Sequence, residues 1–317
     1  MARTSADNRA AEMASAVEMA SAAWAFHRYE EIRDRLPQAC FAQTSVPITS
    51  LADIEDRFDA FVFDSFGVLN VGETPVPAAG PRVAALRTAG KHVLVLTNAA
   101  TGPLADLPRK YSKLGFAFSA AEIVSSRDVL ATALQRFDSD MVWGIVAPVS
   151  SRIEELAVKS QRLCPESAIG REVAGIILLS SQGLDRRLVG RLADLLRKRP
   201  LPVLVGNPDL VAPRETGFSL EPGSYAHDLA DRLGIVPEFF GKPYANAFEA
   251  AKARLPRGMD PARIAMVGDT LHTDILGGAA AGFKTLLVTA DGVMKELDVA
   301  ACIATSGIVP DYIAPHI

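Results

Sequence analysis

The sequence has little cysteine, no excess of basic charge and no long apolar run. Its 317 residues include only three cysteines, which stand far apart at positions 40, 164 and 302. This spacing suggests neither a disulfide framework nor a zinc site. The formal net charge of −4 gives no reason to expect binding to nucleic acid or to an anionic membrane. Apolar runs stay well below the roughly 20 residues of a membrane span, and no secretory signal pattern opens the chain. We therefore expect a cytoplasmic protein.

What the sequence does have is a regular alternation of β-rich and helical segments. Apolar residues make up 49% and charged residues 22%, as in ordinary globular proteins, and the length allows two domains. Short β-rich runs separated by amphipathic helices predict an α/β, Rossmann-like fold with parallel sheets. The predicted strands are 60–64, 92–97, 141–147, 174–180, 201–206, 238–240, 262–267 and 284–289. The predicted helices are 79–89, 103–114, 126–136, 184–198, 223–234, 244–255 and 272–281.

Four polar segments, near residues 64, 97, 242 and 269, divide the chain unevenly. The wide interval between the second and the third has strands and helices of its own, which predicts an inserted cap domain that closes a site against water. We expect the core to comprise 46–140 and 237–317, the cap 141–236, and a helical N-terminal extension 1–45.

The N-terminal extension is rich in Ala, Met and Glu and carries no visible chemistry. Met13, Val17, Ala20 and Trp24 recur at helical spacing, which predicts one or two helices that pack on the body of the protein or on a second subunit. A homodimer is compatible with this pattern.

Carboxylates follow two of the predicted strands. The run Phe61-Val62-Phe63 leads into Asp64, and a second run leads into Asp269, with Asp274 five residues later. The carboxyl ends of parallel strands are where open α/β folds bind ligands. An exposed aspartate there can act as a nucleophile, and three carboxylates together suit Mg²⁺. Helix capping by Asp269, with Asp274 in the first helical turn, is an alternative that is compatible with this reading.

Two further segments carry groups that can bind phosphate. The strand 92–97 ends in Thr97 and Asn98, whose hydroxyl and amide can bond phosphate oxygens. Lys242 lies in Gly241-Lys242-Pro243, just before a helix, where its charge can neutralise a phosphoryl group in transfer. Taken singly, each segment is an ordinary strand end or turn. The occurrence of all four segments in this order makes coincidence improbable.

With these residues the chain resembles the haloacid dehalogenase-like (HAD) hydrolases, in particular the type-IIA branch, whose cap lies between the second and third motifs. The resemblance covers about 55 to 292. It implies a Mg²⁺-dependent phosphatase or phosphotransferase that acts on a small phosphorylated metabolite. In this resemblance Asp64 is the nucleophile and a metal ligand, and Thr97 and Asn98 contact the phosphoryl group. Lys242 is a catalytic lysine that bridges phosphate and nucleophile. The other implied metal ligands are Asp269, Asp274 (directly or through water) and the backbone carbonyl of Phe66.

A cap loop also matches the family. Val205-Gly206-Asn207-Pro208-Asp209 resembles the loop that faces the substrate, which makes Asn207 and Asp209 candidates for specificity. Asn-Pro-Asp is equally an ordinary turn sequence, so both interpretations stand.

Phe66 departs from the family pattern, because phosphatases of this type have an aspartate there that protonates the leaving group. Phenylalanine cannot transfer a proton, and general acid–base catalysis typically contributes about 10²–10⁴-fold. A phosphatase would then need another proton donor: His272 is one candidate (a histidine on a helix surface being the alternative), and His227 and Glu73 are weaker ones. A competing hypothesis is a protein that binds a phosphate compound without turnover. A dehalogenase, which has an aromatic residue at this place but works without metal, fits Asp269 and Asp274 less well.

Overall fold

The structure, a computed structural model, describes residues 20–317. The helices of this part are α2 Ala22–Glu31, α3 Ala79–Thr88, α4 Leu107–Lys113, α5 Ser126–Leu134, α6 Arg186–Lys198, α7 Pro222–Leu233, α8 Ala245–Lys252, α9 Leu276–Ala280 and α10 Val299–Ser306. The strands are β1 Val46–Pro47, β2 Ala60–Phe63, β3 Asn70–Val71, β4 Thr74–Pro75, β5 His92–Thr97, β6 Ile123–Ser125, β7 Val142–Val146, β8 Ser160–Leu163, β9 Val173–Leu178, β10 Val203–Val205, β11 Val211–Pro213, β12 Phe218–Leu220, β13 Glu238–Phe239, β14 Ile264–Gly268, β15 Lys284–Val288 and β16 Tyr312–Ala314.

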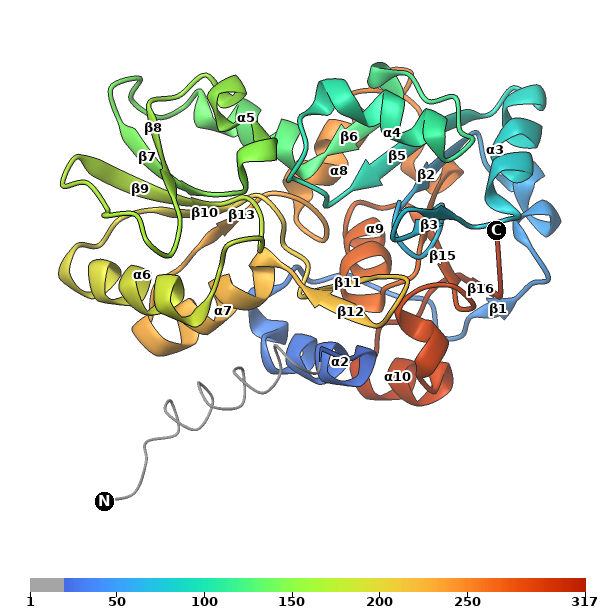
Figure 1. Cartoon of the computed structure of the whole chain (residues 1–317). Helices are drawn as coiled ribbons and strands as arrows, with labels where there is room; N and C mark the ends of the chain where they lie inside the picture. The colour runs from blue at the N-terminus through green and yellow to red at the C-terminus, as the bar shows by residue number, and fades with distance from the viewer. Residues whose placement is uncertain (1–19) are drawn as a thin grey trace.

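Two parallel sheets organise the described part of the chain (Figure 1). The larger has seven strands in the order β1-β16-β15-β14-β2-β5-β6, and each neighbouring pair is parallel. The second has the order β13-β10-β9-β7-β8 and is also parallel. Parallel neighbours need crossover connections, which helices provide here. The predicted α/β fold with a Rossmann-like parallel sheet is thus confirmed.

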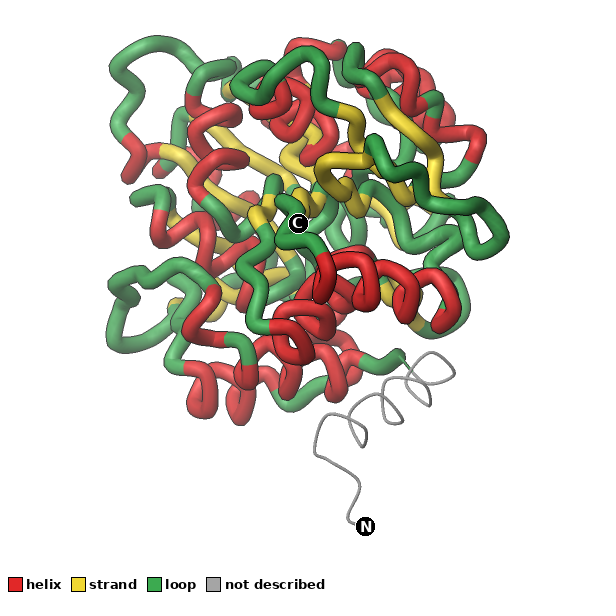
Figure 2. The backbone as a smooth tube through the Cα atoms, turned by 90° about the vertical axis from the view of Figure 1, so that its left-hand side faces the viewer, coloured by secondary structure: helices red, strands yellow, loops and turns green. Residues whose placement is uncertain are grey.

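Strand β2 shows how the large sheet is buried on both faces. Phe61 and Phe63 point into an apolar cluster with α3 and α4, whereas Ala60 and Val62 point into a second cluster with α5 and α8. All four side chains are buried, as expected for a central parallel strand between two helical layers. The view turned by 90° shows helices around the strands (Figure 2). The carboxyl end of β2, and Asp64 after it, is therefore held in a rigid position.

The predicted strands all occur, with ends that differ by at most three residues. Several elements were not predicted, namely β1, β6, β8, β16, the hairpins β3–β4 and β11–β12, and α10. The strands among them have only two to four residues, too few to show a period of two. The predicted helix 272–281 begins with a π-helical turn over Leu271–Ile275, so α9 starts only at Leu276.

The division into core and cap stays a prediction, with one observation at its boundary. Strand β13 lies after the predicted cap limit of 236, yet it pairs with β10 in the second sheet. Of the N-terminal pattern, Met13 and Val17 lie outside the described residues. Helix α2 begins after Ser21, whose hydroxyl accepts a hydrogen bond from the Trp24 N–H at 3.1 Å. Among the residues that the structure describes, no helix is both long and apolar enough to cross a bilayer.

Candidate active site

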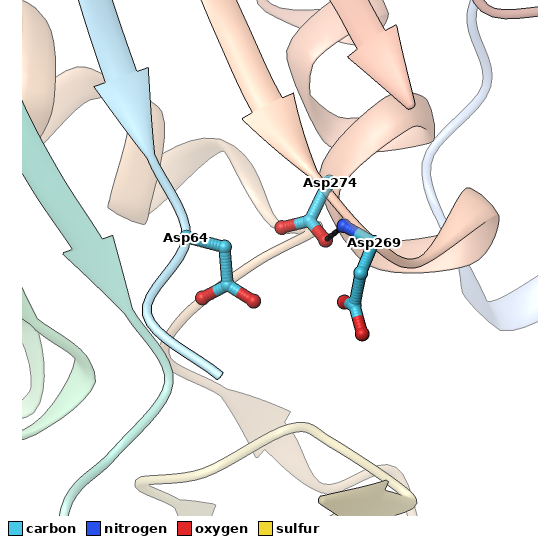
Figure 3. Close-up of side chains that lie close together, drawn as sticks. All are labelled: Asp64, Asp269 and Asp274. Carbon is cyan, nitrogen blue, oxygen red and sulfur yellow. Dashed lines mark hydrogen bonds between the residues drawn. The ribbon is translucent and has the colours of Figure 1, made fainter. Parts of the chain in front are cut away.

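Three carboxylates meet where β2 and β14 end. These strands are parallel neighbours, with Val267 opposite Phe63, so Asp64 and Asp269 leave the same edge of the sheet. In the described chain, carboxylate oxygens of Asp64, Asp269 and Asp274 all lie within 4.8 Å of one another. Figure 3 shows the three side chains directed toward a common space. Strand adjacency has thus brought together groups that are more than 200 residues apart in the sequence.

Lys242 supplies the positive charge of this cluster. Its side chain is only 2% exposed, and its Nζ donates to Asp64 Oδ1 at 2.5 Å and to Asp274 Oδ1 at 2.7 Å. The two carboxylates raise the pKa of Lys242 above its usual range despite the opposing effect of burial. The lysine therefore stays charged beside Asp64.

Asp274 holds the loop and the lysine in place. Its Oδ2 accepts hydrogen bonds from the backbone N–H of Asp269 at 3.2 Å and of Thr270 at 3.1 Å, while Oδ1 accepts from Lys242. Both oxygens are thus already engaged with protein donors. This arrangement fits a metal contact through water at least as well as direct coordination.

The charge balance of the cluster fits a divalent cation. When all three carboxylates are ionised they face one ammonium, which leaves two negative charges in excess. Burial raises the pKa of Asp64 to about 7, and burial together with Asp274 holds the pKa of Asp269 well above its usual range. Oxygen ligands of this kind are those that hard cations prefer. Asp64 and Asp269 would hold the ion, and its positive charge would offset the repulsion between the carboxylates.

Two glycines enclose Asp269 so closely that no side chain fits. A Cβ atom at Gly67 would lie 2.1 Å from Asp269 Oδ2, and one at Gly292 would lie 1.9 Å from it. Gly67 also has a φ of +83°, a conformation that other residues rarely adopt. The Val293 N–H donates to the same Oδ2 at 2.7 Å. The carboxylate of Asp269 is therefore fixed by backbone on several sides.

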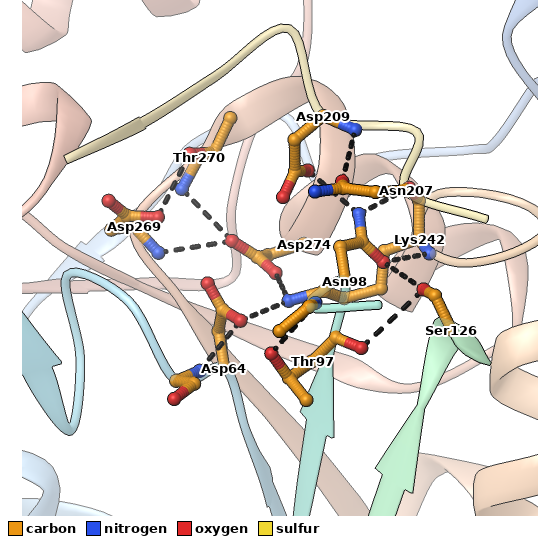
Figure 4. A network of polar contacts seen from close by, with 12 residues as sticks. Asp64, Thr97, Asn98, Ser126, Asn207, Asp209, Lys242, Asp269, Thr270 and Asp274 are labelled. Atoms are coloured by element: carbon orange, nitrogen blue, oxygen red, sulfur yellow. Dashed lines mark hydrogen bonds and ion pairs between the residues drawn. The ribbon is translucent and has the colours of Figure 1, made fainter. Parts of the chain in front are cut away.

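Asn98 ties three segments together (Figure 4). Its Oδ1 accepts from the Lys242 N–H at 2.7 Å and from Ser126 Oγ at 3.0 Å. Its Nδ2 donates to the Lys242 carbonyl at 2.9 Å and to Asp209 Oδ1 at 2.7 Å. These bonds let Asn98 hold the backbone of Lys242 in a fixed position. Thr97 lies buried at the end of β5, where its Oγ1 accepts from the Ala99 N–H at 3.2 Å and can still donate.

The two polar residues of the cap loop differ in position. Asp209 lines the pocket beside Asp64, and burial raises its pKa to about 8. Asn207 lies behind it: its Nδ2 donates to Glu221 at 3.0 Å, and its Oδ1 accepts from the Asp209 N–H at 3.0 Å. Asn207 is not among the pocket-lining residues, so its contact with a substrate stays a prediction.

Phe66 also lines the pocket, and cations surround its ring. Lys110 Nζ lies 4.5 Å and Arg214 Cζ 5.4 Å from the ring centroid, both within the range of cation–π contacts. Lys110 comes from α4 of the core and Arg214 from the loop after β11. The position that would carry an acid in related phosphatases is thus apolar and has positive neighbours.

The histidines considered as proton donors are buried and do not belong to the pocket lining. The alternative that His272 is a surface histidine is wrong, because the residue is only 1% exposed. Its ring stacks on Tyr29, and its Nε2 lies 2.5 Å from Glu30 Oε1. His227 is buried against Phe239, and burial lowers its pKa to about 3. Glu73 is exposed in the turn between β3 and β4. None of the three lines the pocket.

Sequence reasoning missed several residues that line this pocket. Tyr29 of α2 contributes, although the N-terminal extension had shown no visible chemistry, and so do Val211, Ala212 and Pro213 of the hairpin. The free volume is about 20 Å³, close to the space for one water molecule. No local sequence pattern predicts such residues, because their place in the pocket depends on the packing of elements that are far apart in the chain.

Comparison with known families and proteins agrees with this geometry. A family model described as haloacid dehalogenase-like hydrolase matches 61–156, and one described as HAD-hydrolase-like matches 239–317. Human glycerol-3-phosphate phosphatase is 31% identical over 291 residues, which cover 83% of this chain and 88% of that protein.

Solved structures are similar as well. A possible sugar phosphatase of the HAD superfamily from Cytophaga hutchinsonii has 30% identity and a TM-score of 0.76, covering 85% of this chain and 97% of that one. A glycerol phosphate phosphatase from Mycobacterium tuberculosis, in complex with magnesium, has 24% identity and a TM-score of 0.65. The match covers 83% of this chain and 76% of that one. The latter likeness concerns the fold alone.

Proposed function

Because this chain belongs to the haloacid dehalogenase-like hydrolases, we propose that it is a Mg²⁺-dependent phosphatase or phosphotransferase that acts on a small phosphorylated metabolite. One observation carries the proposal: the Asp64 carboxylate lies beside Lys242 and faces Asp269 and Asp274 at the ends of adjacent parallel strands. The phosphatase names of the relatives described above support the same reaction class.

In the proposed reaction, an oxygen of Asp64 attacks the phosphorus atom and the bond to the leaving-group oxygen breaks. Asp64 then carries the phosphoryl group as an acyl phosphate. Water attacks this phosphorus in a second step, which releases inorganic phosphate and restores the carboxylate. In a phosphotransferase, an acceptor hydroxyl replaces the water.

The residues of the site have distinct tasks in both steps. Lys242 offsets charge on the phosphoryl oxygens and on Asp64, while Thr97 donates a hydrogen bond to the phosphoryl group. Asn98 and Asp274 hold Lys242 in position. A Mg²⁺ ion held by Asp64, Asp269 and the Phe66 carbonyl, with Asp274 contacting it directly or through water, would neutralise further charge and align the phosphoryl group for in-line attack.

Phe66 favours a second candidate, a phosphate-ligand binding protein that has lost turnover. Without an acid at this position the leaving group departs unprotonated, so we expect esters with good leaving groups to react best. A binding protein would use the same cation site and lysine but release no phosphate.

The test is phosphate release from para-nitrophenyl phosphate and acetyl phosphate, with Mg²⁺ and with a chelator. We expect metal-dependent turnover that falls roughly 10³-fold or more in Asp64→Asn, because the nucleophile is gone. Asp59→Asn is the matched control, since Asp59 lies at the opposite end of β2 and pairs with the exposed Arg263. Ligand-induced stabilisation without phosphate release from the unaltered chain would instead support the binding protein.

A further inference from the structure

Helix α2 lies across the two sheet-containing parts of the molecule. In Figure 1 it runs below both, near α7 and α10 and next to the β11–β12 hairpin. Its apolar residues Phe26 and Tyr29 share one cluster with Leu271 and Leu276 from the large-sheet side, and the same cluster includes Leu210 of the loop after β10. The helix therefore contacts elements that belong to both sheets.

Ion pairs fix the helix on one side and a hydrogen bond fixes it on the other. Arg28 and the nearby Arg35 both bind Asp231 of α7, where the Arg28 side chain is 11% and the Asp231 side chain 14% exposed. On the opposite side, Nε2 of His272, in the π-helical turn that precedes α9, is hydrogen-bonded to the Glu30 carboxylate. The ion pairs on one side and this hydrogen bond on the other orient the residue between them, Tyr29.

Tyr29 reaches the pocket from this helix. Its side chain is 4% exposed, its ring stacks on His272 at 4.9 Å between centroids, and it lines the pocket together with Asp64 and Asp209. The Leu210 N–H donates to the Tyr29 hydroxyl oxygen at 3.1 Å, so the hydroxyl lies next to the cap loop. Among residues 20–317 no acceptor is found for its own hydrogen, and burial holds the pKa of the phenol well above its usual range. The phenol stays neutral and can donate.

We propose that α2 is part of the catalytic pocket and that the Tyr29 hydroxyl donates a hydrogen bond to an oxygen of the substrate's leaving group. The inference rests on the proposed function, which places the phosphoryl group at Asp64, Thr97 and Lys242. The remainder of the ester then points toward Asp209 and Leu210, where the Tyr29 hydroxyl lies. The tight pocket and this donor together select small phosphate esters that carry a further hydroxyl, ether or carbonyl oxygen.

The test measures binding without turnover. The background is Asp64→Asn with Mg²⁺, because the asparagine side-chain oxygen can still contact the cation but cannot act as a nucleophile. Calorimetry compares glycerol 3-phosphate, which has leaving-group oxygens, with inorganic phosphate, which fills only the phosphoryl position. We expect Tyr29→Phe to weaken glycerol 3-phosphate roughly three- to tenfold, the worth of one neutral hydrogen bond, and to change phosphate binding less than twofold. Tyr244→Phe is the matched control: its buried hydroxyl has no partner in the described structure, and it does not line the pocket.

The outcomes separate the two proposals. Equal weakening of both ligands by Tyr29→Phe means that losing the Leu210 hydrogen bond disturbs the site as a whole, and it overturns the inference. No weakening of glycerol 3-phosphate overturns it as well. Absence of binding of both ligands before Tyr29 is altered overturns the proposed phosphate site itself, and the inference with it.

Discussion

Phe66 faces the pocket from the loop after β2, two residues beyond Asp64. Lys110 and Arg214 lie over its ring, so positive charge surrounds a side chain that cannot carry a proton. Departure of an alkoxide without protonation is slow, whereas nitrophenolate and acetate leave readily. Under the proposed function, we therefore expect the residue at position 66 to influence which phosphate esters the site can cleave.

Replacing Phe66 by aspartate should restore part of the missing acid catalysis. We expect Phe66→Asp to raise kcat/KM for glycerol 3-phosphate at least about tenfold relative to para-nitrophenyl phosphate, the low end of the usual contribution of an acid. Lys110 and Arg214 favour the ionised carboxylate, which lowers its pKa, so the gain should grow as the pH falls from 8 to 5. Rates across this pH range provide the measurement. Phe66→Leu, which has no acid, should show no gain, and an equally inactive, folded Phe66→Asp that binds Mg²⁺ would refute the explanation.

At the scale of elements, α2 links parts of the structure that the sequence keeps far apart. Arg28 lies 203 residues from Asp231, and Glu30 lies 242 residues from His272, yet each pair is in contact. The helix has ten residues, a length at which isolated helices are marginal in water. Its stability therefore depends on these polar contacts and on the burial of Phe26 and Tyr29.

Neutralising Asp231 should loosen this linkage. We expect Asp231→Asn to lower the free energy of unfolding by about 1–3 kcal/mol, because Arg28 and Arg35 lose their common charged partner in a poorly exposed position. Urea denaturation measures the change. Asp34→Asn removes the charge of an exposed aspartate in the same segment and should change the free energy of unfolding by less than about 0.5 kcal/mol. An Asp231→Asn protein as stable as this control would show that the ion pairs do not hold α2.

For the whole molecule, the buried carboxylates link stability to pH and metal. The pKa of Asp64 is raised to about 7, and that of Asp269 is raised well above its usual range. Between about pH 4 and 7 the folded, metal-free protein thus keeps a proton that the unfolded chain has already released. The sign follows from linkage: where the folded state binds more protons, stability falls as the pH rises.

Mg²⁺ should therefore stabilise the protein more at pH 8 than at pH 5.5, because metal and protons compete for the same carboxylates. At a Mg²⁺ concentration of 100 times Kd, we expect about 2.7 kcal/mol at pH 8 and clearly less at pH 5.5. Thermal unfolding with Mg²⁺ and with a chelator at both pH values checks this. Asp269→Asn should remove the metal-dependent shift. A shift of equal size at both pH values, or one that persists in this variant, would contradict the assignment of the metal site.

The sequence by itself determined the α/β fold and the strand ends that carry the site. Strands such as β2 and β14 are short apolar runs, and polar residues right after them belong at the carboxyl edge of a parallel sheet, so Asp64 and Asp269 were predictable from local pattern. The order of the four polar segments also placed Thr97, Asn98 and Lys242 near them. The structure brings these side chains together: Asp64, Thr97 and Asp269 lie at the ends of strands of the large sheet, whereas Lys242 follows β13 of the second sheet. Their roles in the reaction stay predictions.

Tertiary structure alone decided which residues close the site and what their neighbours do. Tyr29 enters the pocket because α2 packs across elements of both sheets, and its hydroxyl meets Leu210, 181 residues away. His272 is buried by the same helix, although its own segment gives it the pattern of a surface residue. Asn98 holds the backbone of Lys242 by a hydrogen bond and also donates to Asp209, a carboxylate from another part of the chain. Such contacts depend on the packing of elements far apart in the chain, and local periodicity carries no information about that packing.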